Sequence, residues 1–178
     1  MRITLAIGLA GALLAPFAMG QKLELKFDHL KSKATEAVET NLDGAALELA
    51  LKAMPQSGKD EKSDKLKMLS GLKGVYVRNF EFSKPGAYSD ADLESVLKQV
   101  RGVPGWSSIV SVKEQQERTE IFLMTKEDQV LGLLILAAEA KELTIVNIVG
   151  SLTQDQVKEL VKSNIRYDLA NLPAAPKH

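Results

Sequence analysis

The chain has 178 residues, of which 45% are hydrophobic and 26% charged, and its 23 basic side chains balance its 23 acidic ones. This balance leaves no basic surplus for binding nucleic acid or anionic lipid, so neither is expected as a partner. The sequence contains no cysteine, which excludes disulfides, thiolate metal ligands and a lipid anchor attached to cysteine.

Residues 1–20 have the pattern of a secretory signal peptide. A basic residue precedes the apolar stretch Ile3–Leu14, and Ala18 and Gly20 place small side chains where a signal peptidase inspects them. We therefore predict cleavage between Gly20 and Gln21. The competing interpretation is a membrane anchor, but the apolar run is shorter than the roughly 20 residues of a span. The mature protein is expected in the periplasm or outside the cell, without stable membrane insertion.

Cleavage would leave 158 residues (178 minus 20), a usual size for one domain with its own hydrophobic core. We expect a single domain over residues 21–170. The polar, glycine-containing stretch 55–65 (PQSGKDEKSDK) is typical of a mobile surface linker. Residues 171–178 contain two prolines and are expected to form a loose tail.

The stretch from Leu23 to Met54 predicts one long helix or two shorter ones. Apolar side chains recur at spacings of three and four from Leu23 to Leu49, which is the period of an amphipathic helix. The segment Asn41–Gly44 marks the place where the helix would divide, since Gly and Asn weaken helices. Pro55 would end it.

Shorter elements follow in order along the chain. Leu72–Phe82 predicts a strand, and Ser89 caps the next helix, with Asp92 in the position of a capping box. Trp106–Lys113 and Ile121–Met124 predict two more strands. A strand, a helix and a strand joined by short links imply a right-handed crossover between parallel neighbours.

Val130–Gly150 is the most apolar part of the mature chain. Two runs, Val130–Ala138 and Leu143–Val149, flank a charged break at Glu139–Glu142 and predict two adjacent antiparallel strands. A last helix follows, with Thr153 as its cap. Together the elements predict an α+β fold: a two-layer sandwich with a mixed five-stranded sheet, and with the long N-terminal helix and two further helices packed on one face.

The residues needed for common catalytic or metal sites are missing from the sequence. The only histidines are His29 and His178, and no G-x-S-x-G nucleophile motif or phosphate-binding glycine spacing occurs. We therefore expect a non-enzymatic protein with no catalytic, cofactor-binding or metal-binding residues and no cofactor. A hydrolase that uses paired carboxylates stays open, although a solvated turn explains Glu139 and Glu142 more simply.

Four residues are candidate contacts for a ligand or partner. Arg78 lies between aromatic residues, either exposed on an edge or paired with Glu81 or a partner's carboxylate. Trp106 begins a strand, where core packing competes with a role as a binding anchor. Tyr88 fits a hydrophobic staple ahead of its helix. Asn147 interrupts an apolar strand, so its amide either bonds a neighbouring loop or lines a ligand pocket.

Three stretches resemble the bacterial domain-of-unknown-function family numbered 4252. They are GLKGVYVRNFEFSKPGAYSDADL (71–93), PGWSSIVSV (104–112) and LLILAAEAKELTIVNIVGSL (133–152), and KATEAVETNLDG (33–44) is similar to the family's N-terminal segment. The resemblance implies an exported protein, largely of Gram-negative bacteria, without established activity. The family's genes often lie near those of alternative sigma factors, which implies a role in envelope signalling. The resemblance implies no catalytic residues.

The leading hypothesis is thus an exported module that binds another envelope protein. A small-ligand carrier is the alternative, with a pocket between the first helix and the sheet that Asn147, Arg78 or Trp106 would line. The carboxylate-dependent hydrolase ranks third.

Overall fold

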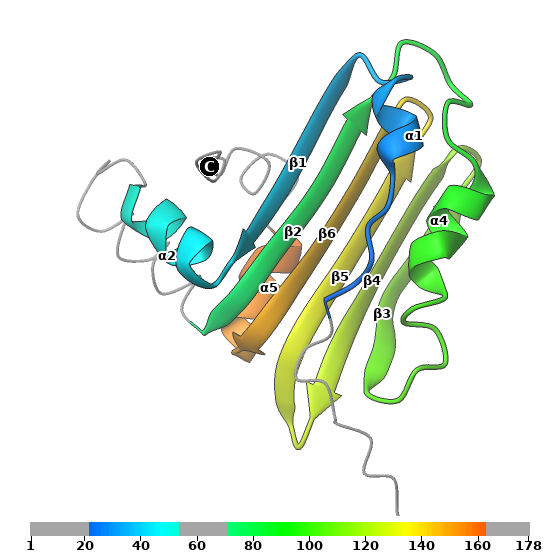
Figure 1. Ribbon diagram of the computed structural model, residues 1–178. Coiled ribbons are helices and arrows are strands. Elements are labelled where there is room, and N and C mark those ends of the chain that lie inside the picture. The colour runs from blue at the N-terminus through cyan, green and yellow to red at the C-terminus, as the bar shows by residue number, and fades with distance from the viewer. Residues whose placement is uncertain (1–21, 54–70, 163–178) are drawn as a thin grey trace, which may run out of the picture.

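The computed structural model describes residues 22–53 and 71–162, which form one six-stranded antiparallel sheet with helices on both faces (Figure 1). The strands are β1 (Glu36–Asp43), β2 (Leu72–Glu81), β3 (Trp106–Glu114), β4 (Glu117–Lys126), β5 (Gln129–Glu139) and β6 (Glu142–Leu152). The helices are α1 (Asp28–Lys31), α2 (Gly44–Ala53), α4 (Asp90–Leu97) and α5 (Gln154–Lys162). The sheet order is β1-β2-β6-β5-β4-β3. The predicted signal peptide, linker and tail lie outside the described residues.

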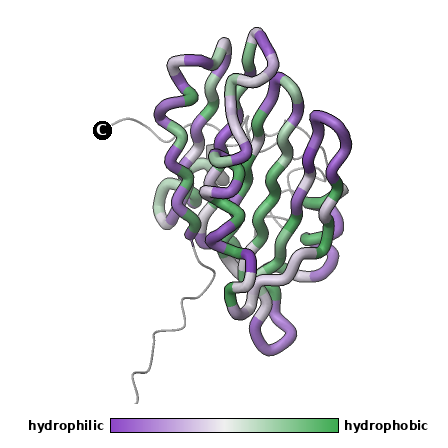
Figure 2. Tube along the Cα trace, turned by 90° about the vertical axis from the view of Figure 1, so that its right-hand side faces the viewer, coloured by the Kyte–Doolittle hydropathy of each residue, from purple (hydrophilic) through white to green (hydrophobic). Residues whose placement is uncertain are grey.

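The β5–β6 hairpin forms the centre of the sheet, which confirms the two antiparallel strands predicted there. Ile135 pairs with Val146, and the register continues without a shift to the end at Glu139 and Glu142. The hairpin is buried on both faces because both alternating sets of its side chains are apolar. Figure 2 shows the hydrophobic colouring along the central strands and hydrophilic residues toward the hairpin ends.

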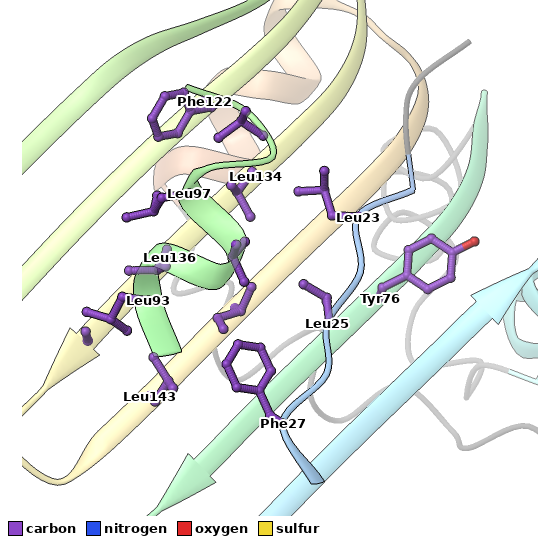
Figure 3. Close-up of a cluster of buried hydrophobic side chains, with 14 of the residues drawn as sticks. Leu23, Leu25, Phe27, Tyr76, Leu93, Leu97, Phe122, Leu134, Leu136 and Leu143 are labelled. Carbon is purple, nitrogen blue, oxygen red and sulfur yellow. The ribbon is translucent and has the colours of Figure 1, made fainter. Parts of the chain in front are cut away.

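One face of the sheet is covered by α4 and by the extended segment of residues 22–27, which we call the strap. Figure 3 shows Leu23, Leu25 and Phe27 reaching from the strap into the cluster that holds Leu134 and Leu136. The opposite face packs against α2 and α5, whose buried Leu47, Ala50, Val157 and Leu160 meet side chains of β2 and β6. We refer to these as the strap face and the α5 face.

The prediction of a long N-terminal helix over Leu23–Met54 is wrong. That stretch contains the strap, four-residue α1, strand β1 and helix α2. In the strap, buried Leu23, Leu25 and Phe27 alternate with exposed Lys22, Glu24 and Lys26, which is the period of an extended chain. The apolar spacings of three and four residues that indicated a helix therefore combine positions from separate elements.

The predicted two-layer α+β sandwich, with a five-stranded mixed sheet and helices on one face, is also wrong, because the described residues form mainly sheet with short helices on both faces. β2 and β3 run in the same direction, but β6, β5 and β4 lie between them, so α4 does not link parallel neighbours. Every pairing is antiparallel, and β1 supplies a sixth strand. The sheet needs cover on both faces because the central strands are apolar on both sides.

Several local predictions are confirmed. Strands occupy the predicted positions at β2, β3 and β4, and α4 begins after Ser89 with its capping box. The N–H of Thr153 donates to Gln156 Oε1 at 2.7 Å, and the N–H of Gln156 donates back to Thr153 Oγ1 at 3.2 Å. None of the helices in the described residues is long and apolar enough to cross a membrane.

Candidate functional site

A cluster of two arginines and two glutamates joins α4 and its C-terminal loop to β4. Glu120 points from β4 toward the strap face and is 5% exposed. Its Oε1 accepts hydrogen bonds from Arg101 Nη2 at 2.9 Å and from Arg118 Nε and Nη2 at 3.0 and 2.9 Å. Both arginines also contact Glu94 on α4. The two positive charges and the two negative charges therefore balance within the cluster.

Arg118 holds its charge firmly in this cluster. Burial alone would lower the pKa of Arg118, but hydrogen bonds and charges from Glu120 and then Glu94 outweigh burial and raise it. Each carboxylate is therefore matched by a permanent cation. This arrangement fixes α4 on the sheet.

A cavity of about 430 Å³ opens beside this cluster, between the loop leading into α4 and the β3–β4 hairpin. Leu93, Ala138 and Ala140 give it an apolar lining. Its polar lining includes Tyr88, Ser89, Asp90, Lys113, Glu117 and Arg118. The Tyr88 hydroxyl donates to the carbonyl oxygen of Glu139, and burial, with the charges of Glu139 and Asp90, raises the pKa of Tyr88. A smaller cavity of about 210 Å³ lies near Gly150 and Lys126.

Ser89, Asp92 and His29 are hydrogen-bonded to one another but do not form a hydrolytic triad. The Ser89 hydroxyl donates to Asp92 Oδ2 at 2.8 Å, and His29 Nε2 lies 2.7 Å from Asp92 Oδ1. In a triad the histidine stands between serine and aspartate and takes the proton of the hydroxyl. Here the aspartate stands in the middle, so the group caps α4 and ties α1 to it.

The same hydrogen bonds predict a pH dependence of stability. Burial would raise the pKa of Asp92, but hydrogen bonds from Ser89 and His29 outweigh it, so the folded-state pKa lies below the ordinary 3.8. A depressed pKa stabilises the fold above 3.8, and this contribution is lost as pH falls through the folded-state value. In urea unfolding at pH 2 to 6, we expect Asp92→Asn to flatten the acid loss of stability. Asp90→Asn, an exposed neighbour, should leave that loss in place; equal slopes for both variants would contradict the assignment.

The four predicted contact residues do not converge on one site. Asn147 is fully buried, and its Oδ1 accepts the backbone N–H of Leu23 at 3.0 Å, which anchors the strap. Arg78 pairs with Glu39 at 3.4 Å rather than with Glu81, and its Nη2 donates to Asn41 Oδ1 at 3.0 Å. These partners lie in the strap and in β1, elements that the sequence did not predict.

The two aromatic candidates also lie apart. Trp106 is 8% exposed in the core of the strap face, and its indole Nε1 meets no acceptor among the described residues. Of the four residues, Tyr88 alone lines the larger cavity, and none lines the smaller one. Their role as ligand or partner contacts stays a prediction.

Sequence inspection missed the surface formed by β3, which is an edge strand of the sheet. Ile109 and Val112 are each 46% exposed, and Val110 is partly buried against the hydrophobic cluster of the α5 face. The first seven residues of β3, WSSIVSV, carry no charge. We call Ile109, Val110 and Val112, with the edge of β3 that no described strand pairs with, the β3 surface. The opposite edge strand, β1, carries three acidic residues.

No group of three or more His, Cys, Asp or Glu side chains that could hold a metal ion occurs within residues 22–53 and 71–162. A family model described as Domain of unknown function (DUF4252) matches residues 31–160. The comparison with curated proteins and the comparison with solved structures each return no match.

Proposed function

We propose a function for this chain as a member of the family described as Domain of unknown function (DUF4252), to which it belongs. The protein is an exported, non-enzymatic module that binds another envelope protein. The β3 surface is the observation that carries this proposal, because it combines a free strand edge with exposed apolar side chains. A link to envelope signalling is part of the proposal and rests on the resemblance described above.

The β3 surface suits a protein partner for two reasons. An edge strand presents unpaired N–H and C=O groups that another extended chain can bind, and natural edges are usually protected by charges. Residues 106–112 carry no such charge, and Ile109 and Val112 leave apolar area in contact with solvent. Exposed apolar patches commonly mark interaction sites.

The polar clusters support a non-enzymatic role. In the described residues, the Glu94 and Glu120 carboxylates are paired with arginines, and the Ser89 hydroxyl donates to the carboxylate of Asp92, which also accepts the backbone N–H of Ser89. A hydrolytic serine is usually activated by a base that is free to take its proton. The Asp92 carboxylate is instead engaged by the Ser89 backbone N–H and by His29, so these hydrogen bonds serve the fold.

The binding test compares two matched lysine variants of residues 21–178. Val112→Lys places a charge on the β3 surface, whereas Leu49→Lys changes a side chain on α2 that is 49% exposed. Both variants should unfold at the wild-type temperature. An envelope protein captured by wild type and by Leu49→Lys, but not by Val112→Lys, and then rebound in purified form would support the proposal. Equal capture by all three proteins, or substrate turnover by the pure protein, would overturn it.

Export is tested separately by expressing the full chain and fractionating the cells. We expect the protein in the periplasmic fraction, with Gln21 as its first residue by N-terminal sequencing. A cytoplasmic protein that keeps Met1 would contradict export.

A small-ligand carrier is the second candidate, and the cavity beside Tyr88 favours it. Its volume of about 430 Å³ lies within the usual range for ligand pockets. Its apolar lining would take the tail of a small amphipathic acid, and Lys113 would take the carboxylate. Arg118 is already paired with Glu120 and Glu94. Asp90 and Glu117 also line the cavity. A shift in unfolding temperature with such acids that disappears in Lys113→Gln would support this candidate, and the absence of any shift would exclude these acids.

A further inference from the structure

We propose that β3 pairs antiparallel with β3 of a second copy of this chain, about a two-fold axis at Val112, so that one sheet continues through both copies. The inference rests on the proposed function, because it takes the same β3 surface as a binding surface and names a second copy as an occupant that an envelope partner would have to displace. The proposed assembly is a homodimer. Binding of a different protein at this edge is the alternative that the experiments below distinguish from it.

The two edges of the sheet differ in their ability to pair with themselves. Antiparallel self-pairing of β1 over its length would place Glu36 opposite the partner subunit's Asp43, and like charges directly opposite each other destabilise a sheet. The corresponding residues of β3 are uncharged up to Val112, and only Lys113 and Glu114 at its end carry charge. The acidic residues of β1 therefore disfavour its self-pairing, whereas the first seven residues of β3 carry no charge that would do so.

Pairing β1 of one copy with β3 of the next would be heterologous, and it would extend into filaments instead of closing. The acids of β1 work against that arrangement as well, because they would be brought beside the apolar β3 surface. A two-fold β3–β3 contact closes after two copies and buries the same surface on each. It is the closed arrangement that these two edges favour.

The irregularity within β3 sets the register. The pairing with β4 shifts between Ser108 and Val110, and it is regular from Val110 to Glu114. A two-fold axis at Val112 uses this regular part, with Val112 opposite the partner subunit's Val112. Ser111 then lies opposite the partner's Lys113, and Val110 opposite the partner's Glu114, so no like charges face each other.

The size of this contact sets its strength. Five residues from each strand bury less than the standard interface of about 1,600 Å². We therefore expect a dimer with a dissociation constant in the micromolar range or weaker, which forms at high local concentration. The exposed valine at the axis gains most from the contact because it loses its solvent-facing area to an identical side chain.

The absence of cysteine makes the axis directly testable. Residues directly opposite each other in an antiparallel pair have Cα atoms about 4.5–5.5 Å apart, within the range that a disulfide bridges. Val112→Cys should therefore form a disulfide-linked dimer under mild oxidation at least ten times faster than Leu49→Cys, which lies on α2. Val110→Cys, which lies off the axis, should also be slower. Equal rates for Val112→Cys and Leu49→Cys would overturn the proposal, and a faster Val110→Cys would overturn the register.

Sedimentation of the cysteine-free protein provides the second measurement. Wild type should associate as concentration rises to about 1 mM, and Val112→Lys should stay monomeric with an unchanged unfolding temperature. A wild type that is monomeric throughout would refute the homodimer, and so would a dimer that persists in Val112→Lys. If the wild type is monomeric but Val112→Lys still loses its envelope partner, the homodimer fails while the proposed function stands.

Discussion

Phe27→Ala should lower the free energy of unfolding by about 3–5 kcal/mol, the usual cost of truncating a buried aromatic side chain. Phe27 is 1% exposed at the end of the strap, and its ring lies 6.2 Å from that of Phe80, centroid to centroid. Urea unfolding followed by circular dichroism measures the change. Phe27 is the largest buried side chain of the strap, so its truncation should also loosen the strap residues that precede it.

Hydrogen exchange distinguishes a detached strap from a uniformly weaker fold. The amide of Leu23 donates to Asn147, and it should lose protection in Phe27→Ala more than the amides of the β5–β6 hairpin do. Lys26→Ala is the matched control, because it changes an exposed strap residue, and its effect should stay below about 0.5 kcal/mol. Similar losses for both variants would contradict the packing described for the strap.

Glu120→Gln should cost about 3 kcal/mol, toward the lower end of the effect of breaking a buried ion pair, because Arg101 is 39% exposed and partly screened. The substitution keeps the size of the side chain but leaves two guanidinium groups with the Glu94 carboxylate alone. Chemical denaturation at neutral pH measures the loss.

Glu94→Gln is the control for this cluster, since Glu94 makes ion pairs with the same arginines but its side chain is 46% exposed. We expect a loss of less than about 1 kcal/mol, as for surface ion pairs. An equal effect of the two substitutions would mean that burial of Glu120 does not decide the strength of the cluster.

The elements predicted correctly from the sequence are those whose signals are local. The capping residues Ser89 and Thr153 lie next to the helices they start, and the β5–β6 hairpin joins two apolar runs by a short turn. The N-terminal segment failed because residues 22–43 take their conformation from distant partners. β1 forms because β2 pairs with it, and the strap lies extended because the strap face of the sheet receives its apolar side chains.

The candidate site depended on topology in the same way. β3 was predicted as a strand, but its place at the edge follows from the order of all six strands. No short sequence pattern predicts that order. The ion pair between Arg78 and Glu39 likewise joins strands that are separate in sequence. Asn147 was expected either to bond a neighbouring loop or to line a pocket, and its partner is 124 residues away in the strap.

The pairing of β2 with β6 and the hydrogen bond from Leu23 to Asn147 have a consequence for biosynthesis. A chain emerging from the ribosome has made its strap and β2 long before the strand that both of them need. Until β6 has emerged, the middle of the sheet has a gap, and the strap lacks both its hydrogen bond to Asn147 and part of the surface it packs on. The core is therefore complete only after β6 has been synthesised, which leaves the strap accessible until then.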